Sequence, residues 1–352
     1  MKPPVALSRT FFIITGLLVL LLAQASFGQT AATTESSAAP ATANQAPPAA
    51  ASAPAATTPQ TPTPGGNPEN PENESVTTIR TTVDEVRVVF TVTDKHGRYI
   101  KDLKKDDFKV LDDKKPAELR SFRSETDLPL QVGLLIDASN SVRDRFKFEQ
   151  EAAIEFLNAT IRPHSDKAFI VGFDVTPEVT QDFTDNTEKL SIGVRALRAG
   201  GGTAMFDALY FACRDKLLKQ EQTGPVRRAI ILLSDGEDNA SHVTREEAID
   251  MAQRAEAIVY TISTNISGMK GQGDKILTRI ADATGGRAFF PFQLRDVSEA
   301  FLSIQEELRS QYAVAYKPEN FIADGRYRTI DIVAPGKSLK VRTRKGYYAP
   351  KQ

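Results

Sequence analysis

The stretch VGLLIDASNS, residues 132–141, decides the fold: an apolar run that ends in one carboxylate and two hydroxyls. Residues 132–136 form a continuous apolar run, as expected for a strand covered on both faces. Asp137, Ser139 and Ser141 follow at intervals of two residues. Because carboxylate and hydroxyl oxygens are hard ligands, this loop suits a small divalent cation. The stretch therefore predicts a buried strand that carries a metal-binding loop at its end.

Two later segments supply further oxygen ligands. Thr203 lies in GGGTAMFDAL, and Asp235 follows an apolar run in RRAIILLSDGEDNAS. In an open α/β sheet, ligands bind beyond the carboxyl ends of the strands, where the strand order reverses. If the strands before Asp137 and Asp235 are neighbours there, the two aspartates converge in one crevice. We expect a binding surface rather than a catalytic centre.

The middle of the chain, residues 128–310, alternates strand and helix patterns. Phe148, Ala152 and Phe156 lie one helical turn apart, which indicates an amphipathic helix. Thr244 with Glu247 forms a capping box, and a helix ending at Thr284 is followed by two glycines. The expected strands are Gln131–Asp137, Ala168–Asp174, Glu178–Phe183, Arg228–Asp235, Ile258–Thr264 and Ala288–Phe292. The alternation predicts a doubly wound α/β fold with a mostly parallel, six-stranded sheet.

Two β-rich flanks, residues 75–127 and 311–352, surround this middle segment. Each shows the two-residue alternation of strands, and each is too small to bury a good core alone. We expect them to pair into one discontinuous β domain in which the middle segment is inserted. The basic run at Lys340, Arg342, Arg344 and Lys345 is interpreted as a solvated strand face, and contact with an anionic glycan or lipid is the alternative.

The N-terminal segment is typical of an exported protein. Residues 1–28 carry two basic residues, an apolar core of about 13 residues and small residues near Ala25 and Gly28, which is the layout of a signal peptide. A retained anchor is the alternative, and it would give the only membrane contact. Residues 29–74 are rich in Ala, Pro and Thr and predict a disordered tether. The expected location is the periplasm, the cell surface or the medium.

Composition argues against several classes of protein. The formal net charge is −1, so a nucleic-acid partner is not expected. The only cysteine, Cys213, cannot form an internal disulfide and is interpreted as a small core residue. The three histidines lie outside any HExxH pair, and the chain has neither a GxSxG elbow nor a P-loop lysine. A non-enzymatic protein is expected. A structural scaffold without a metal-dependent ligand is the alternative, and a hydrolase is less favoured.

The DxSxS pattern, the GGT threonine and the SDG aspartate together resemble the metal-ion-dependent adhesion site of the von Willebrand factor type A domain. The resemblance covers roughly residues 128–310, and the flanks resemble an exported bacterial subgroup of that family. It implies that Ser139, Ser141 and Thr203 bind the ion directly, and that Asp137 and Asp235 bind it directly or through water.

The same resemblance implies a cofactor and a partner. The ion would be Mg²⁺, with Mn²⁺ or Ca²⁺ as alternatives, and the sixth position would take an exposed Asp or Glu of a protein ligand. Asn140 departs from the glycine that many members have, but asparagine tolerates a left-handed backbone. Asp207 is interpreted as a residue behind the site or on the helix surface, and Asp238 with Ser241 as turn residues.

Overall fold

The computed structural model describes residues 85–124, 128–221, 224–265, 267–319, 322–334, 336 and 338–350. These residues fall within one compact unit, residues 77–352. The signal peptide and tether predicted for residues 1–74 lie outside the described residues. Among the helices that are described, none combines the length and the apolar character needed to cross a membrane.

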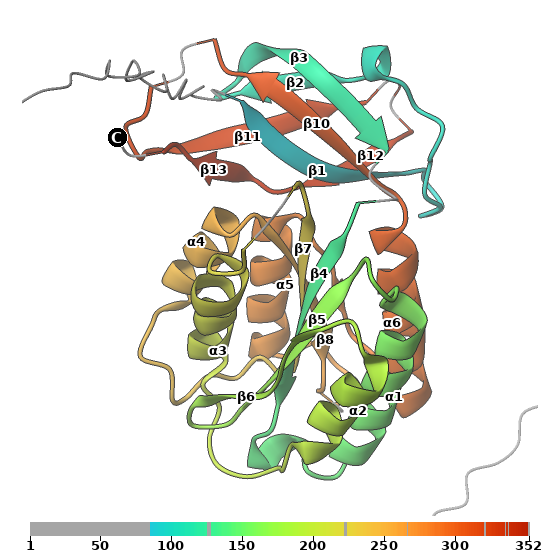
Figure 1. The fold of residues 1–352 in the computed structure, drawn as a ribbon, viewed down its shortest axis with the longest axis vertical. Helices are drawn as coiled ribbons and strands as arrows, with labels where there is room; N and C mark the ends of the chain where they lie inside the picture. The colour runs from blue at the N-terminus through green and yellow to red at the C-terminus, as the bar shows by residue number, and fades with distance from the viewer. Residues whose placement is uncertain are drawn as a thin grey trace, which may run out of the picture. The chain divides into compact units, whose positions relative to one another are not determined.

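The described chain forms two β-sheets and a set of helices (Figure 1). The strands are β1 (Val86–Thr93), β2 (Lys109–Asp112), β3 (Lys115–Ser124), β4 (Leu130–Asp137), β5 (Lys167–Phe173), β6 (Pro177–Thr184), β7 (Arg227–Ser234), β8 (Ala257–Ser263), β9 (Ala288–Phe289), β10 (Gln311–Lys317), β11 (Tyr327–Val333), β12 (Lys340–Thr343) and β13 (Gly346–Tyr348). The α-helices are α1 (Phe146–Thr160), α2 (Thr187–Ala196), α3 (Met205–Phe211), α4 (Arg245–Arg254), α5 (Gln272–Thr284) and α6 (Leu294–Leu308). Shorter helical segments are η1 (Lys105–Asp107), η2 (Asn140–Val142) and the π-helical turn η3 (Ala212–Leu217).

The six-stranded sheet has the order β6-β5-β4-β7-β8-β9. Its pairs are parallel except for β6, which runs antiparallel to β5. The mostly parallel, doubly wound sheet expected from the sequence is confirmed, although β9 has two residues where a strand to Phe292 was expected. Strand β4 lies between β5 and β7, so the chain's path reverses there. The carboxyl ends of β4 and β7 therefore meet at one edge of the sheet.

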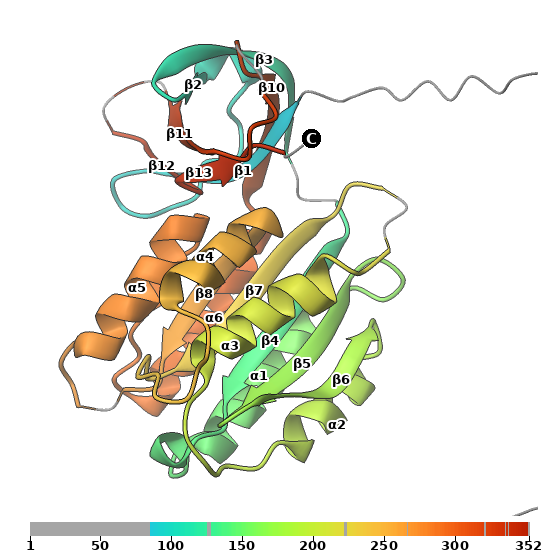
Figure 2. The same cartoon turned by 90° about the vertical axis from the view of Figure 1, so that its left-hand side faces the viewer.

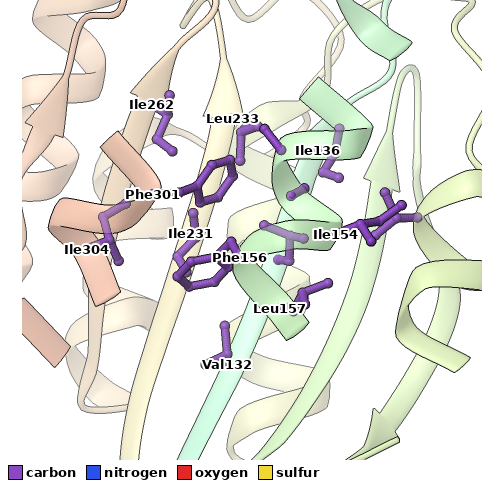
Figure 3. Close-up of a cluster of buried hydrophobic side chains, with 14 of the residues drawn as sticks. Val132, Ile136, Ile154, Phe156, Leu157, Ile231, Leu233, Ile262, Phe301 and Ile304 are labelled. Carbon is purple, nitrogen blue, oxygen red and sulfur yellow. The ribbon is translucent and has the colours of Figure 1, made fainter. Parts of the chain in front are cut away.

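Helices cover both faces of this sheet (Figure 2). On one face α1, α2 and α6 pack against alternate strand residues such as Leu134 and Ile136. On the other face α3, α4 and α5 pack against the intervening residues, among them Leu135. Figure 3 shows the first core, in which Phe156 of α1 and Phe301 of α6 stack with ring centroids 5.0 Å apart. Burial on both faces explains why these strands read as continuous apolar runs.

Local sequence signals mark the start of α4 and the end of α5 at the expected residues. Thr244 and Glu247 form the capping box of α4. Helix α5 ends at Gly285, whose φ of 85° lies in the left-handed region. A Cβ at this position would lie 2.5 Å from the backbone nitrogen of Arg344, so glycine is needed for close approach as well as for its conformation. Cys213 is fully buried in η3, as expected for a core residue, and burial raises the pKa of its thiol to about 12.

The second sheet has seven strands in the order β12-β1-β10-β3-β2-β11-β13. It combines strands from both flanks of the chain: β1 pairs antiparallel with β10 and with β12, and β2 with β11. Its core contains an aromatic cluster. The ring centroid of Phe108 lies 5.0 Å from that of Phe90 and 5.5 Å from that of Phe122. The division of the chain into separate domains at residues 128 and 310 stays a prediction.

The interpretation of the basic run at residues 340–345 as a solvated strand face is wrong for Arg342 in β12 and for Arg344 just after it, although Lys340 and Lys345 are exposed. Arg344 is only 8% exposed, and Arg342 forms an ion pair with the fully buried Glu307 of α6. Arg344 donates to the carbonyl of Arg87 and contacts Glu256 at the end of α4. Alternation of charged residues indicated one exposed face, but these two long side chains reach acidic partners on α6 and just after α4, where they are half-buried or buried.

Candidate metal centre

Asp137 is the last residue of β4, and its side chain is fully buried. Its Oδ1 accepts a hydrogen bond from the backbone N–H of Ser139 at 2.9 Å, and its Oδ2 accepts one from the hydroxyl of Ser234 at 2.6 Å. Ser234 ends the neighbouring strand β7. No described basic side chain forms an ion pair with this carboxylate. Asp137 is thus a buried acid that is held by dipoles rather than by a cation of the protein.

The two serine hydroxyls after Asp137 lie together. The Oγ atoms of Ser139 and Ser141 are 2.9 Å apart. Asn140 between them does not adopt a left-handed backbone and belongs to η2 instead. Its side-chain Nδ2 donates to the carbonyl of Gly201 at 3.2 Å, and its backbone N–H also points to that oxygen at 3.4 Å. Asn140 therefore ties the serine loop to the loop that carries Thr203.

Thr203 is 4% exposed, and its backbone is fixed by the loop after β7. Its N–H donates to Oδ1 of Asn239 at 2.9 Å, and its carbonyl accepts from the N–H groups of Asn239 and Ala240. The preceding Gly200 donates to the carbonyl of Ala138 at 2.6 Å. Three loops that are distant in sequence are thereby joined through their main chains.

The neighbouring acids act as structural groups. Asp238 accepts hydrogen bonds from the N–H and hydroxyl of Ser241, as expected for a turn, and also from the N–H of Phe206. Asp207 accepts from the N–H groups of His242 and Val243 and lies 2.9 Å from the His242 ring. Burial alone would raise the pKa of Asp207, but these donors hold it below its usual range. These bonds join α3 to the segment that precedes α4, and the place of Asp207 relative to the metal site stays a prediction.

Asp235 follows Ser234 directly, and its Oδ1 accepts a hydrogen bond from the N–H of Glu237 at 3.0 Å. The next residue, Gly236, has a φ of 81° and lies against α5, where a Cβ would come within 2.3 Å of the carbonyl oxygen of Gly273. Only glycine fits this close approach. The main chain at Asp235 is therefore set both by β7 and by the start of α5.

The electrostatics of the site favour a cation. Burial raises the pKa of Asp137 to about 6, despite its hydrogen bonds to Ser234 and Ser139, and the charge of Asp235 raises it further. Glu149 of α1 is also buried, and burial raises its pKa to about 8. Arg145, 3.6 Å away, opposes this shift, while Asp137 and Asp235 add to it. Buried acids that raise one another's pKa in this way make the site electronegative, and a bound cation would relieve their repulsion.

Three contributors to the site were missed in the sequence. Ser234 donates to Asp137, and Asn239 accepts from the N–H of Thr203. Their positions near Asp235 in LLSDGEDN were the only hint in the sequence that they belong to the site. Glu149 had no signal, because its position in α1 resembles an ordinary polar helix residue. Among the described residues, no three His, Cys, Asp or Glu side chains are grouped so as to hold a metal. A site built of two carboxylates and three hydroxyls does not need such a group.

Comparison with known proteins finds a family match for the part of the chain that carries these loops. Residues 132–237 match the family model of the von Willebrand factor type A domain. Calcium-activated chloride channel regulator 1 of Bos taurus is 30% identical over 168 residues, which is 45% of this chain and 17% of that protein. This chain therefore spans about a sixth of that relative.

Two solved structures with partial similarity are a thread matrix protein and a domain of a pili tip protein. Proximal thread matrix protein 1 from the mussel byssus has a TM-score of 0.46 and 16% identity, and the match covers 56% of this chain and 51% of that one. The vWF domain of the type V pili tip protein Mfa5 from Porphyromonas gingivalis has a TM-score of 0.41 and 16% identity over 52% of this chain and 95% of that domain. Sheet order, loop positions and the family match lead to one conclusion: this chain carries a von Willebrand factor type A domain, matched over residues 132–237.

Proposed function

We propose that the type A domain binds a protein partner through a divalent metal ion. Ser139, Ser141 and Thr203 would hold the ion directly, and Asp137 and Asp235 would hold it directly or through water. The observation that carries this proposal is the buried, unpaired charge of Asp137 beside two hydroxyls whose oxygens lie 2.9 Å apart. A buried carboxylate without a cation is costly, and a bound ion would remove that cost.

The donor set favours Mg²⁺, with Mn²⁺ and Ca²⁺ as alternatives. Mg²⁺ prefers six oxygen ligands, usually with one or two carboxylates and several neutral oxygens. Two aspartates supply two negative charges, which only just neutralise the ion. If one of them is held off by water, the bound ion would stay electrophilic enough to attract a further carboxylate, and we propose that an exposed Asp or Glu of the partner supplies it. Asn140 and Asn239 would hold the three loops at the spacing this requires.

We further propose that the protein is exported and displays this domain outside the cytoplasm. Residues 1–28 have the pattern of a signal peptide and residues 29–74 that of a tether, which supports presentation of the domain away from its point of attachment. The oxygen ligands of the candidate metal centre suit an ion that bridges to a partner, so we propose a binding function rather than a reaction.

The test compares capture of proteins from the exported fraction by the full chain in Mg²⁺, in Mn²⁺ and in EDTA. Partners that depend on the site should be retained with the metals and lost in EDTA, and Asp137→Ala should lose them under all conditions. Asp282→Ala, at an exposed position of α5, is the matched control and should behave as the wild type. Capture that survives both EDTA and a folded Asp137→Ala variant would support a scaffold without a metal-dependent ligand.

A further inference from the structure

An exposed arginine lies next to the most exposed of the proposed metal ligands. Arg143 directly follows η2, two residues after Ser141, and its backbone has helical angles. Of the five proposed ligands, Ser141 is exposed and Asp235 is half-buried, whereas the other three are buried. A partner that contacts the ion would therefore approach from the side of Ser141. Arg143 is close enough in the chain to meet the same partner.

A hydrogen bond holds the guanidinium of Arg143 against the metal loop. Its Nη2 donates to Oδ1 of Asn140 at 2.9 Å. The amide of Asn140 in turn donates through Nδ2 to the carbonyl of Gly201 at 3.2 Å. Asn140 lies between the two serines, and Gly201 lies two residues before Thr203. The positive charge of Arg143 is thus held at the junction of two loops that supply proposed ligands.

The charge of Arg143 is not balanced by an acid in the described part of the chain. Its hydrogen bond goes to a neutral amide, and no described carboxylate, including that of its exposed neighbour Asp144, forms an ion pair with it. Most of the N–H donors of the guanidinium therefore remain free for an acceptor from outside the chain. These donors form a flat fork that matches the two oxygens of a carboxylate.

A purely structural role does not need the charge of Arg143. Asn140 is already joined to the carbonyl of Gly201 by its backbone N–H and by its side chain. The bond from Arg143 adds one contact at the surface, and replacement of a surface residue usually changes stability little. Loss of the guanidinium should therefore leave the metal loop intact and affect only what approaches it from outside.

We infer that the partner presents two carboxylates, one that binds the ion and a second that pairs with Arg143. The inference rests on the proposed function, because the first carboxylate is the one proposed there for the ion. A single acidic side chain would contact the ion alone, whereas an acidic pair would also gain charge-assisted hydrogen bonds at the arginine. The partner that fits is a protein whose surface exposes two neighbouring Asp or Glu residues.

The experiment uses small dicarboxylates in place of the acidic pair and measures their binding to the full chain by ligand-observed NMR titration. The probes are glutarate, adipate and pimelate, each compared with its monomethyl ester, which has nearly the same length but one carboxylate. With Mg²⁺ in excess, at least one dicarboxylate should bind about three- to fivefold more tightly than its ester, after correction for its two equivalent carboxylates. The dicarboxylates and the esters should all lose binding in EDTA.

Two exposed cations four residues apart provide the matched comparison. Arg143→Gln should remove the advantage of the dicarboxylate over its ester without weakening the binding of Mg²⁺. Lys147→Gln removes the same charge from an exposed position of α1 and should keep the full advantage. Arg143→Lys should keep part of it, because lysine retains the charge but lacks the planar fork of donors.

The possible failures separate this inference from the proposed function. If the esters bind only in Mg²⁺ but no dicarboxylate binds more tightly than its ester, the second carboxylate is overturned and the metal-dependent site stands. Equal losses in Arg143→Gln and Lys147→Gln would mean general attraction of anions, and weaker Mg²⁺ binding in Arg143→Gln would mean a role in shaping the metal loop instead. No Mg²⁺-dependent binding of any probe would overturn the proposed function and this inference with it.

Discussion

At the scale of single residues, Ser234 is the support of the candidate metal centre. Its hydroxyl donates to Oδ2 of the buried Asp137 at 2.6 Å and also accepts from the N–H of Gly236 at 3.1 Å. Groups that orient a metal ligand affect metal affinity although they do not touch the ion. Their effect should therefore be visible in binding as well as in stability.

Ser234→Ala should weaken Mg²⁺ binding by about 10- to 100-fold and lower the free energy of unfolding by about 1–3 kcal/mol. The measurements are calorimetric titration with Mg²⁺ and urea unfolding without metal. Ser191→Ala is the control, because this buried hydroxyl donates only within α2 at 2.8 Å and should change stability alone. Unchanged Mg²⁺ affinity in Ser234→Ala would contradict the supporting role.

Asp166 should make the protein sensitive to acid. Its fully buried carboxylate accepts hydrogen bonds from the N–H of Leu130 and from Arg162 and Arg309. Burial alone would raise its pKa, but these donors outweigh burial and hold the pKa below its usual range. The stability that the group contributes is full above the ordinary aspartate pKa of about 3.9 and is lost as the pH falls through the lower folded value.

The change to test this is Asp166→Asn, which should lower the free energy of unfolding by about 2–3 kcal/mol at pH 7. Below about pH 4 the difference from the wild type should shrink. Urea unfolding across this pH range is the measurement, with Asp282→Asn as an exposed control. A difference that stays constant with pH would show that the carboxylate charge is not the cause.

At the scale of elements, α6 shows how a helix is held by one face. Phe301 is 2% exposed and stacks on Phe156 of α1, whereas the next residue, Leu302, is 62% exposed. Phe301→Ala should cost about 3–5 kcal/mol, because it removes buried area and leaves a cavity. Leu302→Ala should change stability by no more than about 0.5 kcal/mol. Thermal and urea unfolding of both variants measure the contrast, and similar costs would contradict the packing described.

Local sequence patterns predicted the strands and the helix caps, but they did not predict which side chains of distant elements contact one another. The run before Asp137 predicted β4 because a strand buried on both faces must be apolar throughout. The capping box at Thr244 and the helix end at the glycine after Thr284 were also predicted correctly, because each depends only on residues close together in the sequence. The alternation at Arg342 and Arg344 misled, because burial of these side chains depends on Glu307 and Glu256, which come from distant elements.

The residues of the candidate site also fall into two groups, those with a signal in the local sequence and those without one. The order of Asp137, Thr203 and Asp235 and the position of the two aspartates after apolar runs are sequence features, and the predicted site rests on them. Glu149 could not, because its closeness to Asp137 and Asp235 arises only when α1 packs beneath the end of β4. The hydrogen bonds of Asn140 and Asn239 to other loops could not be predicted either, because they join residues that are distant in the sequence.

At the scale of the whole molecule, Glu307 joins the two sheets. This fully buried residue of α6 accepts hydrogen bonds from Tyr260 of β8 at 2.9 Å and from Tyr99 at 2.8 Å, and it pairs with Arg342 of β12. The carboxylate of Glu307 thus contacts the hydroxyl of a tyrosine in β8 of one sheet and the guanidinium of an arginine in β12 of the other. Such a shared group should make the two sheets unfold together.

Glu307→Gln should destabilise the protein by about 1–3 kcal/mol, because it removes the buried charge that accepts from Tyr99 and Tyr260 and pairs with the half-buried Arg342. Glu306→Gln, at the exposed neighbouring position, should have little effect. Hydrogen exchange should show one cooperative transition for both sheets in the wild type. Separate unfolding of the seven-stranded sheet in the wild type would contradict the coupling.

The central claim is that five side chains from three loops hold one divalent ion, and a calorimetric titration of the metal-free chain with Mg²⁺ tests it most directly. The wild type should bind one ion per chain, and Asp137→Ala and the double variant Ser139→Ala with Ser141→Ala should lose that binding while remaining folded. Asp282→Ala should retain it. No saturable binding by the wild type, or undiminished binding by these folded variants, would contradict the claim.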